Sequence, residues 1–212
     1  MNDWLADTRT SYDTVASSYA GIVRDAVTTQ PYLRAALALF AEQAGGPVVD
    51  VGCGPGHFTA HLASLGLDAS GVDLSPSMIE LAREAYPGVR FEVGSMTDLP
   101  LPDTSVAGVL ASWSLIHIPD DAVPGVLGHF HRVLRPGGRL MIGYHVGDES
   151  TLKTRGYGGH PMKVHIHRRR PERVGALVRD AGFEIEAEWL MAPDDDVPQA
   201  ILFARRPAVV SG

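Results

Sequence analysis

The feature that most limits the possible folds of this chain is a short apolar run that ends in three closely spaced glycines. Residues 47–51 read PVVDV, and glycines follow at positions 52, 54 and 56. A short, continuous apolar run is typical of a strand buried on both faces of a parallel sheet. Glycines after such a strand allow positive φ angles and let the backbone approach a ligand closely. The run therefore predicts a parallel sheet with a ligand site at the carboxyl end of its first strand.

Strand and helix patterns alternate through the rest of the chain. Before the first strand, apolar residues at helical spacing predict helices over residues 10–23 and 31–44. The later pattern predicts helices over 58–65, 76–85, 121–134 and 171–181, and strands over 69–73, 89–93, 106–112, 139–145, 183–189 and 200–204. This alternation predicts a doubly wound, mostly parallel seven-stranded α/β sheet with helices on both faces and an antiparallel last strand.

Charge is unevenly distributed along the chain. The formal net charge is −7 over 212 residues, yet the stretch 145–180 holds eight basic and four acidic residues. An acidic balance argues against duplex DNA or an anionic membrane as the main partner, because binding to phosphates requires a basic face. The one basic stretch is consistent with a small anionic substrate.

The cysteine content and the first residues bear on the location of the protein. The single Cys53 cannot form a disulfide within the chain. Residues 1–10 have neither the basic segment nor the apolar segment of a secretion signal. No apolar run reaches the ~18–20 residues of a membrane-spanning helix. We therefore expect a cytoplasmic protein in a reducing environment.

An acidic residue at the end of the second predicted strand indicates the kind of ligand. Asp73 is placed to bind the two hydroxyls of a ribose, which predicts a nucleoside-containing cofactor. A dinucleotide site has its third glycine where His57 stands here, so that pyrophosphate can sit on the next helix. Asp50 beside the turn would repel pyrophosphate and would suit a sulfonium or ammonium group. The turn favours a sulfonium cofactor, and an NAD(P)-dependent oxidoreductase is the first alternative.

Five segments in consecutive order resemble those of one enzyme family. They read VVDVGCGPGH (48–57), GVDLSPSMIELAR (71–83), FEVGSMTDLPLPD (91–103), VLASWSLIHIP (109–119) and LRPGGRLMIGYH (134–145). With them the chain resembles the class I S-adenosylmethionine-dependent methyltransferases, particularly small bacterial enzymes similar to those of ubiquinone biosynthesis. The resemblance implies a Rossmann-like fold, the cofactor S-adenosylmethionine, and methyl transfer to O, N or C of a small-molecule metabolite. A catalytically silent binding protein of the same fold is the second alternative.

Matching the family's motifs to this chain gives a set of expected cofactor residues. Asp73 would hold the ribose, and Leu74 would pack on the adenine. Many relatives place an acid after the third strand; Ser95 stands there, so its hydroxyl and the Met96 N–H would replace that acid. The full implied set is Asp50, Gly52, Gly54, Gly56, Asp73, Leu74, Ser95, Met96, Ser112 and Trp113, with Tyr12 and Tyr19 from the N-terminal helix. Ordinary helix packing is an equally open explanation for the two tyrosines.

Histidines are the main candidates for catalysis and substrate binding. A histidine is the usual base when the acceptor atom carries a proton. We expect His145 and then His117, which follow the fifth and fourth strands, to act as a base or to orient substrate; a structural role is open for each. Further along the chain, substrate contacts are expected from Tyr157, His160, His165, His167 and Arg168. No carboxylate or cysteine completes a ligand set with these histidines, so no metal is expected.

The length predicts one domain over residues 1–212. We expect an N-terminal helical cap (1–45), a cofactor-binding core (46–145), a substrate lid (146–170), and a C-terminal helix and strand pair (171–206). A solvated basic surface is the alternative explanation for the lid segment. The expected partner is a small molecule, with no nucleic acid and no membrane, and we expect a monomer or a homodimer.

Overall fold

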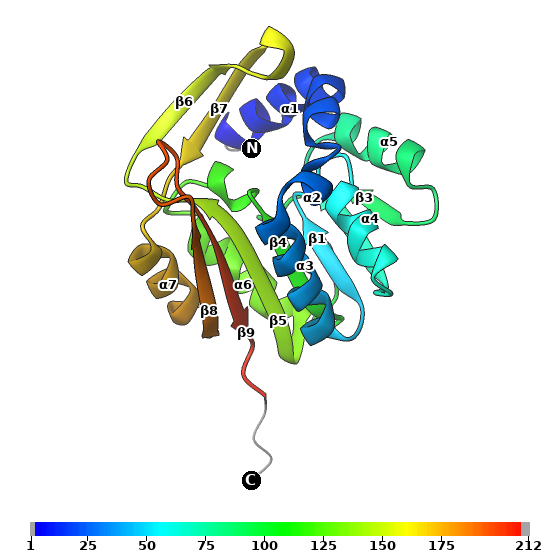
Figure 1. The fold of residues 1–212 in the computed structure, drawn as a ribbon, viewed down its shortest axis with the longest axis vertical. Helices are drawn as coiled ribbons and strands as arrows, with labels where there is room; N and C mark the ends of the chain where they lie inside the picture. Colours follow the sequence, from blue (N-terminus) through cyan, green and yellow to red (C-terminus); the bar gives the residue numbers. More distant parts are fainter. Residues whose placement is uncertain (1–2, 209–212) are drawn as a thin grey trace.

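A seven-stranded sheet forms the centre of the computed structural model, which describes residues 3–208 (Figure 1). Its strands are β1 (Val48–Val51), β2 (Ala69–Asp73), β3 (Arg90–Val93), β4 (Val106–Ser112), β5 (Leu134–His145), β8 (Glu184–Met191) and β9 (Gln199–Arg205). The order across the sheet is β3-β2-β1-β4-β5-β9-β8. Neighbours among β1 to β5 pair in parallel, whereas β9 is antiparallel to β5 and β8. The predicted mostly parallel sheet with an antiparallel last strand is confirmed.

Helices cover both faces of this sheet. Helices α3 (Pro31–Ala44), α4 (His57–Ser64) and α5 (Pro76–Ala85) lie on one face, and α6 (Val123–Val133) and α7 (Pro171–Asp180) lie on the other. In β4, Val109 and Ala111 belong to the core under α6 and α7, and Leu110 belongs to the core under α3. All three side chains are fully buried. Burial on both faces explains why the central strands are almost entirely apolar.

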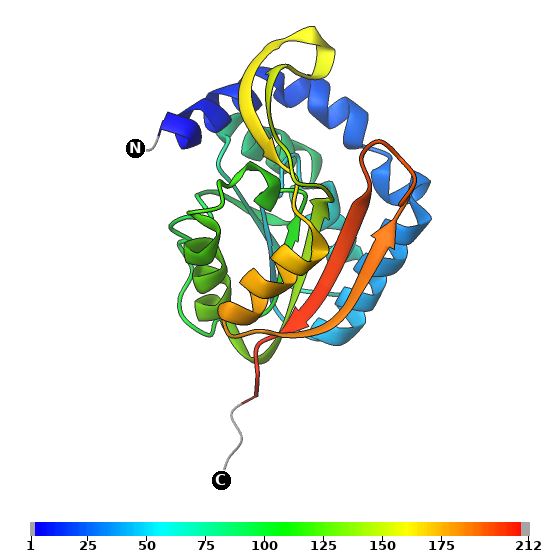
Figure 2. The ribbon, with the colours of Figure 1, turned by 90° about the vertical axis from the view of Figure 1, so that its left-hand side faces the viewer.

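Helix α1 (Asp3–Val23) and a β-hairpin lie over the carboxyl ends of the parallel strands (Figures 1 and 2). The hairpin consists of β6 (Ser150–Arg155) and β7 (Pro161–His167), joined through the short helix η2 (Tyr157–Gly159). Val15 of α1 packs on Met162 and Val164 of β7, and all three are buried. The Ser11 hydroxyl accepts a hydrogen bond of 2.8 Å from the Lys163 backbone N–H. The helix and the hairpin therefore form one cover above the sheet.

The structure differs from the sequence prediction by more than two residues at two element starts. Helix α1 begins at Asp3 instead of residue 10, because Trp4 and Thr8 continue the spacing that Tyr12 and Val15 share. Strand β5 begins at residue 134 instead of 139: Val106 pairs with Leu134, and the next pairing shifts to Gly108 with Arg139. The Arg-Pro-Gly-Gly stretch is thus accommodated as an irregularity inside β5. Residues 146–170 contain a paired hairpin, and whether that hairpin moves as a lid stays a prediction.

Two short helices connect the larger elements. Helix α2 (Ala26–Thr29) lies between α1 and α3, and η1 (Leu115–His117) follows β4. Among the described residues, no helix combines the length and the apolar character that crossing a bilayer requires.

The three consecutive arginines after β7 bond to neighbouring segments of the chain. Arg169 is only 5% exposed, and its guanidinium donates to Asp120 (2.8 Å) and to the carbonyls of Leu115 and Ile118. Arg170 pairs with Asp148, and Arg168 donates to the Asp196 carbonyl at 3.3 Å. These bonds use part of the donor capacity of the arginines within the fold, and a contact of Arg168 with a substrate stays a prediction.

Replacing the buried arginine should destabilise the fold. Arg169→Ala is expected to lower the free energy of unfolding by about 2–4 kcal/mol, because the buried Ile118 carbonyl loses its side-chain donor and the Leu115 carbonyl keeps only the Ile118 N–H. Urea unfolding followed by circular dichroism measures this change. Arg170→Ala is the matched control, since Arg170 and Asp148 are both largely exposed, and its unfolding midpoint should stay near that of the native chain. Equal midpoints for both variants would contradict the structural role of Arg169.

Candidate active site

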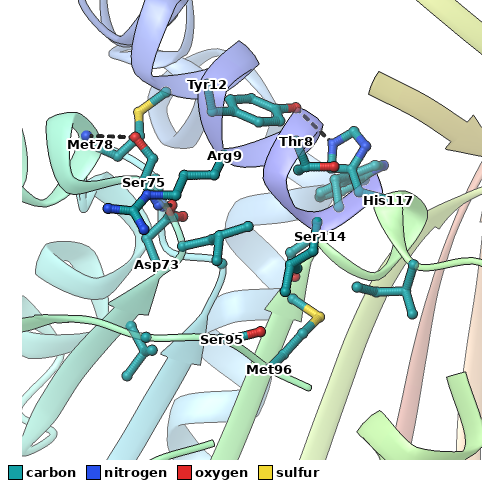
Figure 3. A pocket seen from close by; sticks show the side chains of 18 of the residues that line it. Thr8, Arg9, Tyr12, Asp73, Ser75, Met78, Ser95, Met96, Ser114 and His117 are labelled. Atoms are coloured by element: carbon teal, nitrogen blue, oxygen red, sulfur yellow. Dashed lines mark hydrogen bonds between the residues drawn. The ribbon is translucent and has the colours of Figure 1, made fainter. Parts of the chain in front are cut away.

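A cavity of about 730 Å³, measured out to its open mouth, lies between α1 and the carboxyl ends of β1, β2 and β4. We call it the central cavity. Of the residues expected at a cofactor or catalytic site, it is lined by Tyr12, Tyr19, Gly52, Gly54, Asp73, Leu74, Ser95, Met96, Ser112, Trp113 and His117 (Figure 3). Residues far apart in the sequence therefore meet at the edge of the sheet where the glycine turn predicted a ligand.

The carboxylate of Asp73 is held in place by the backbone. Its Oδ2 accepts the Gly54 N–H and its Oδ1 accepts the Ser75 N–H, both at 2.8 Å. Burial raises the pKa of Asp73 to about 6, the two N–H donors oppose that rise, and the charge of Asp13 adds to it. Each carboxylate oxygen can accept a further hydrogen bond. The end of β2 thus presents a fixed acceptor pair to the cavity.

Different structural constraints require glycine at the three positions of the turn. All three have positive φ angles, of 79° at Gly52, 54° at Gly54 and 82° at Gly56. A Cβ at Gly52 would stand 2.3 Å from the Ser114 Cβ, and one at Gly56 would stand 2.6 Å from the Phe91 ring. Gly56 does not line the central cavity. Its close packing against Phe91 explains why glycine is required there, and its predicted cofactor contact stays a prediction.

Asp50 lies behind the turn and does not line the central cavity. It is 1% exposed, its Oδ2 accepts the Thr59 hydroxyl at 2.8 Å, and its Oδ1 has no partner. Burial raises the pKa of this carboxyl to about 7, against the effect of the Thr59 bond. The predicted contact of Asp50 with a cofactor is not direct in this arrangement and stays a prediction.

The walls beyond Asp73 are largely apolar. Val72, Leu74, Met78, Met96 and Ile118 line the cavity. The Ser95 hydroxyl accepts the Thr97 N–H at 3.1 Å and bonds to the Thr97 hydroxyl at 2.7 Å, so it is engaged in its own turn. These apolar walls form a slot beside Asp73, and such a slot suits a flat base next to a ribose.

Tyr12 and His117 form a hydrogen-bonded pair at the opposite side of the cavity from Asp73 (Figure 3). The Tyr12 hydroxyl lies 2.7 Å from His117 Nε2, and His117 Nδ1 lies 2.9 Å from the His165 carbonyl. A carbonyl can only accept, so Nδ1 carries the proton and Tyr12 donates to Nε2. Burial lowers the pKa of His117 to about 4, which keeps the ring neutral at physiological pH. His117 is therefore an acceptor that orients Tyr12.

The remaining predicted residues lie outside the central cavity. His145 and Tyr157 line a second cavity, and His165 and His167 line a third, open cleft. The rings of His165 and His167 stack with centroids 5.9 Å apart, as an extended segment predicts. His160 is exposed near the hairpin tip, and Arg168 bonds the loop between β8 and β9. The structure does not bring these six residues together, and their roles stay predictions.

Sequence reasoning missed four cavity residues from the start of α1. Trp4, Leu5, Thr8 and Arg9 line the central cavity. The sequence pattern that could have revealed them is the helical spacing, which continues from Tyr12 toward the N-terminus. A further residue of this helix, Asp13, accepts hydrogen bonds from the Ser75 hydroxyl (2.6 Å) and the Ser77 N–H (3.2 Å), which attaches α1 to the start of α5.

The cavity residues fit an S-adenosyl cofactor. Asp73 offers two acceptors to a ribose diol, the apolar slot suits adenine, and the backbone of Gly52 and Gly54 borders the cavity without side chains. The buried hydroxyl of Ser112 has no partner and is available to a polar group of the ligand. Among residues 3–208, no three histidine, cysteine or acidic side chains come together as metal ligands.

Comparisons with known proteins agree with this site. Residues 48–138 match a family model described as a methyltransferase domain. A demethylmenaquinone methyltransferase of Tropheryma whipplei is 33% identical over 141 residues, which cover 65% of this chain and 58% of that protein. Phosphoethanolamine N-methyltransferase 3 of Arabidopsis thaliana is 32% identical over 153 residues, covering 66% and 29%. The chain thus spans less than two thirds of the length of these curated relatives.

Solved structures share the fold. A Burkholderia thailandensis 1,6-didemethyltoxoflavin-N1-methyltransferase, with 1,6-didemethyltoxoflavin and S-adenosylhomocysteine bound, is 26% identical with a TM-score of 0.73, covering 97% of this chain and 89% of that one. A methyltransferase structure from Methanosarcina mazei, at 20% identity and a TM-score of 0.68, covers 76% and 92% and supports the fold alone. With the glycine turn, Asp73 and the sheet order, these matches support a class I S-adenosylmethionine-dependent methyltransferase.

Proposed function

We propose that this protein transfers a methyl group from S-adenosylmethionine to O, N or C of a small-molecule metabolite and releases S-adenosylhomocysteine. The observation that carries the proposal is the Asp73 carboxylate, fixed by two backbone N–H groups at the mouth of the glycine turn. The names of the relatives, which include a phosphoethanolamine and a demethylmenaquinone methyltransferase, support a small molecule as acceptor.

The bound sulfonium would supply an activated methyl group: the acceptor atom gives an electron pair to the methyl carbon, and sulfur keeps the pair of the bond that breaks. The residues of this chain position the reactants for that displacement. Asp73 would accept the ribose hydroxyls, and Leu74 and Met96 would enclose the base. Helix α1 lies over the cavity and would limit the access of water (Figure 1). Alignment of this kind accounts for a large part of the rate in such reactions.

Neither alternative function is favoured. An NAD(P)-dependent oxidoreductase would place pyrophosphate at the start of α4, where His57 is buried and the unpartnered Asp50 oxygen lies behind the turn. A silent binding protein of the same fold would bind the cofactor without transferring its methyl group to any acceptor. Measured turnover separates that alternative from an enzyme.

Cofactor binding is the first test of the proposal. In isothermal titration we expect S-adenosylmethionine and S-adenosylhomocysteine to bind, and NAD⁺ not to bind. Asp73→Ala should weaken binding about 10–150-fold, because it deletes a charged acceptor worth about 1.5–3 kcal/mol. Asp68→Ala is the matched control, since Asp68 is an exposed carboxylate paired with Arg90. Binding of NAD⁺ alone would overturn the proposal.

The affinity for S-adenosylhomocysteine should depend on pH through Asp73. Burial places the pKa of Asp73 at about 6 without ligand, and the ribose hydroxyls donate to its charged form. Ribose binding therefore lowers this pKa, and affinity falls as the pH drops through about 6 because protonation competes with the ligand. Titrations at about pH 5 and about pH 8 measure the difference. In Asp73→Asn the change in affinity between the two pH values should shrink. An unchanged pH dependence in this variant would show that another ionisable group causes it.

Turnover should depend on the pair at the other end of the cavity. We expect His117→Ala and Tyr12→Phe each to lower the rate of methyl transfer about 10-fold or more, because the first removes the acceptor that orients the Tyr12 hydroxyl and the second removes the hydroxyl itself. The assay incubates protein and methyl-labelled S-adenosylmethionine with a metabolite extract of the source cell and identifies the labelled product. His129→Ala on α6 is the control.

Since the pKa of His117 is about 4, the rate should show no ionisation of His117 between about pH 6 and about pH 8. Rates unaffected in both variants would remove the pair from the mechanism.

A further inference from the structure

A second cavity of about 720 Å³ borders the central cavity and has a different chemistry. The two share Tyr12, Tyr19, Ser112 and Trp113 as wall residues. The second cavity extends to the end of β5, the starts of α3 and α4, and the hairpin helix η2. We call it the aromatic cavity. Because the two cavities share these wall residues, a ligand in the aromatic cavity would lie next to the proposed cofactor site.

No aspartate, glutamate, lysine or arginine lines the aromatic cavity. Its two histidines are neutral at physiological pH: burial lowers the pKa of His57 to about 4, and burial together with Arg168 and Lys153 lowers the pKa of His145. Lys153 is not part of the lining, although its Nζ lies 3.9 Å from the centroid of the Tyr157 ring, so a charged ligand would lose its hydration among uncharged lining residues. The wall therefore suits a neutral ligand.

Aromatic rings make up much of this wall. They come from Tyr12, Tyr19, Phe58, Trp113 and Tyr157. Tyr19 and Tyr157 meet edge to face with centroids 4.7 Å apart, and Tyr12 and Tyr19 do so at 5.9 Å. Rings in such arrangements leave faces and edges on which a further planar ring can pack. The lining thus favours a flat, conjugated molecule over an aliphatic chain.

The same wall holds a group of buried polar atoms without partners. Residues 3–208 contain eight buried side-chain nitrogen and oxygen atoms of this kind. Five of them belong to residues of the aromatic cavity: both ring nitrogens of His57, Trp113 Nε1, His145 Nδ1 and Ser112 Oγ. An unsatisfied buried polar group costs about 1–3 kcal/mol. A ligand with both donors and acceptors would pair with these groups if their side chains turned toward the cavity.

We propose that the aromatic cavity binds the methyl acceptor, and that this acceptor is a neutral, planar heterocycle with N–H and ring-nitrogen or carbonyl groups at its edge. The inference rests on the proposed methyltransferase function and names its substrate class. The competing site is the open cleft lined by Asp7, Asp121, Lys163, His165 and His167, which would suit a charged acceptor. That cleft shares His117, Trp4 and Thr8 with the central cavity but carries the charges that the aromatic cavity lacks.

The test observes the indole N–H of Trp113 by NMR in ¹⁵N-labelled protein saturated with S-adenosylhomocysteine. Trp113→Phe assigns that resonance among the three tryptophans. The probes are three neutral bicyclic heterocycles, namely lumazine, quinazolin-4-one and indazole, and the contrasting charged aliphatic is phosphoethanolamine. We expect at least one heterocycle to shift the Trp113 resonance and phosphoethanolamine to leave it in place. A shift by phosphoethanolamine alone, or by none of the four, overturns the substrate class.

Variants decide which cavity is occupied. Gln30→Trp and Ala26→Phe add bulk to the aromatic cavity from α2 and its C-terminal end, and neither residue lines the central cavity. Gln30 is exposed, so its variant should fold even if the buried Ala26 tolerates no larger side chain. Both should weaken heterocycle binding about 10-fold or more and leave the affinity for S-adenosylhomocysteine unchanged.

Ser150→Trp is the matched control, because Ser150 is an exposed residue that lines only the charged cleft. Heterocycle binding lost in Ser150→Trp and kept in Gln30→Trp would assign the acceptor to the cleft and overturn the inference. Failure of the native protein to bind S-adenosylhomocysteine would instead overturn the proposed function. The two failures are therefore distinguishable.

Discussion

The two hydrogen bonds that the Asp73 carboxylate accepts hold the site together. One comes from Gly54 in the turn after β1 and the other from Ser75 at the start of α5. A single side chain thus fixes the distance between two loops, and its charge is stabilised by backbone donors although burial raises its pKa. The cavity, its apolar slot and the attachment of α1 through Asp13 to Ser75 all depend on this arrangement.

The cover above the sheet depends on a second chain of bonds. His117 in η1 donates to the His165 carbonyl in β7 and accepts from Tyr12 in α1. Three segments that are distant in the sequence therefore meet at one neutral imidazole. Together with the packing of Val15 on the hairpin, this chain sets the wall that separates the central cavity from the charged cleft.

The sheet and the cofactor end of the site could be predicted from the sequence, because both depend on local patterns. Buried strands read as short apolar runs, and Asp73 could be placed by its position at a strand end. The acceptor end could not be placed, because it depends on how α1 and the hairpin pack. The sequence favours His145 over His117, both of which follow parallel strands, yet of the two only His117 lines the central cavity. Asp50 looked like a ligand residue, and its burial behind the turn follows from its bond to Thr59.

Part of the local charge excess is paired within the fold. Between positions 145 and 180 the chain is basic, which suggested an anionic acceptor. Arg169 and Arg170 instead fasten the end of the hairpin to η1 and to the loop before β6, where their charges are matched by Asp120 and Asp148. A guanidinium that already donates to an aspartate and to backbone carbonyls has few donors left for a ligand. The proposed acceptor site therefore rests on the uncharged lining of the aromatic cavity, four of whose residues carry buried polar atoms without partners.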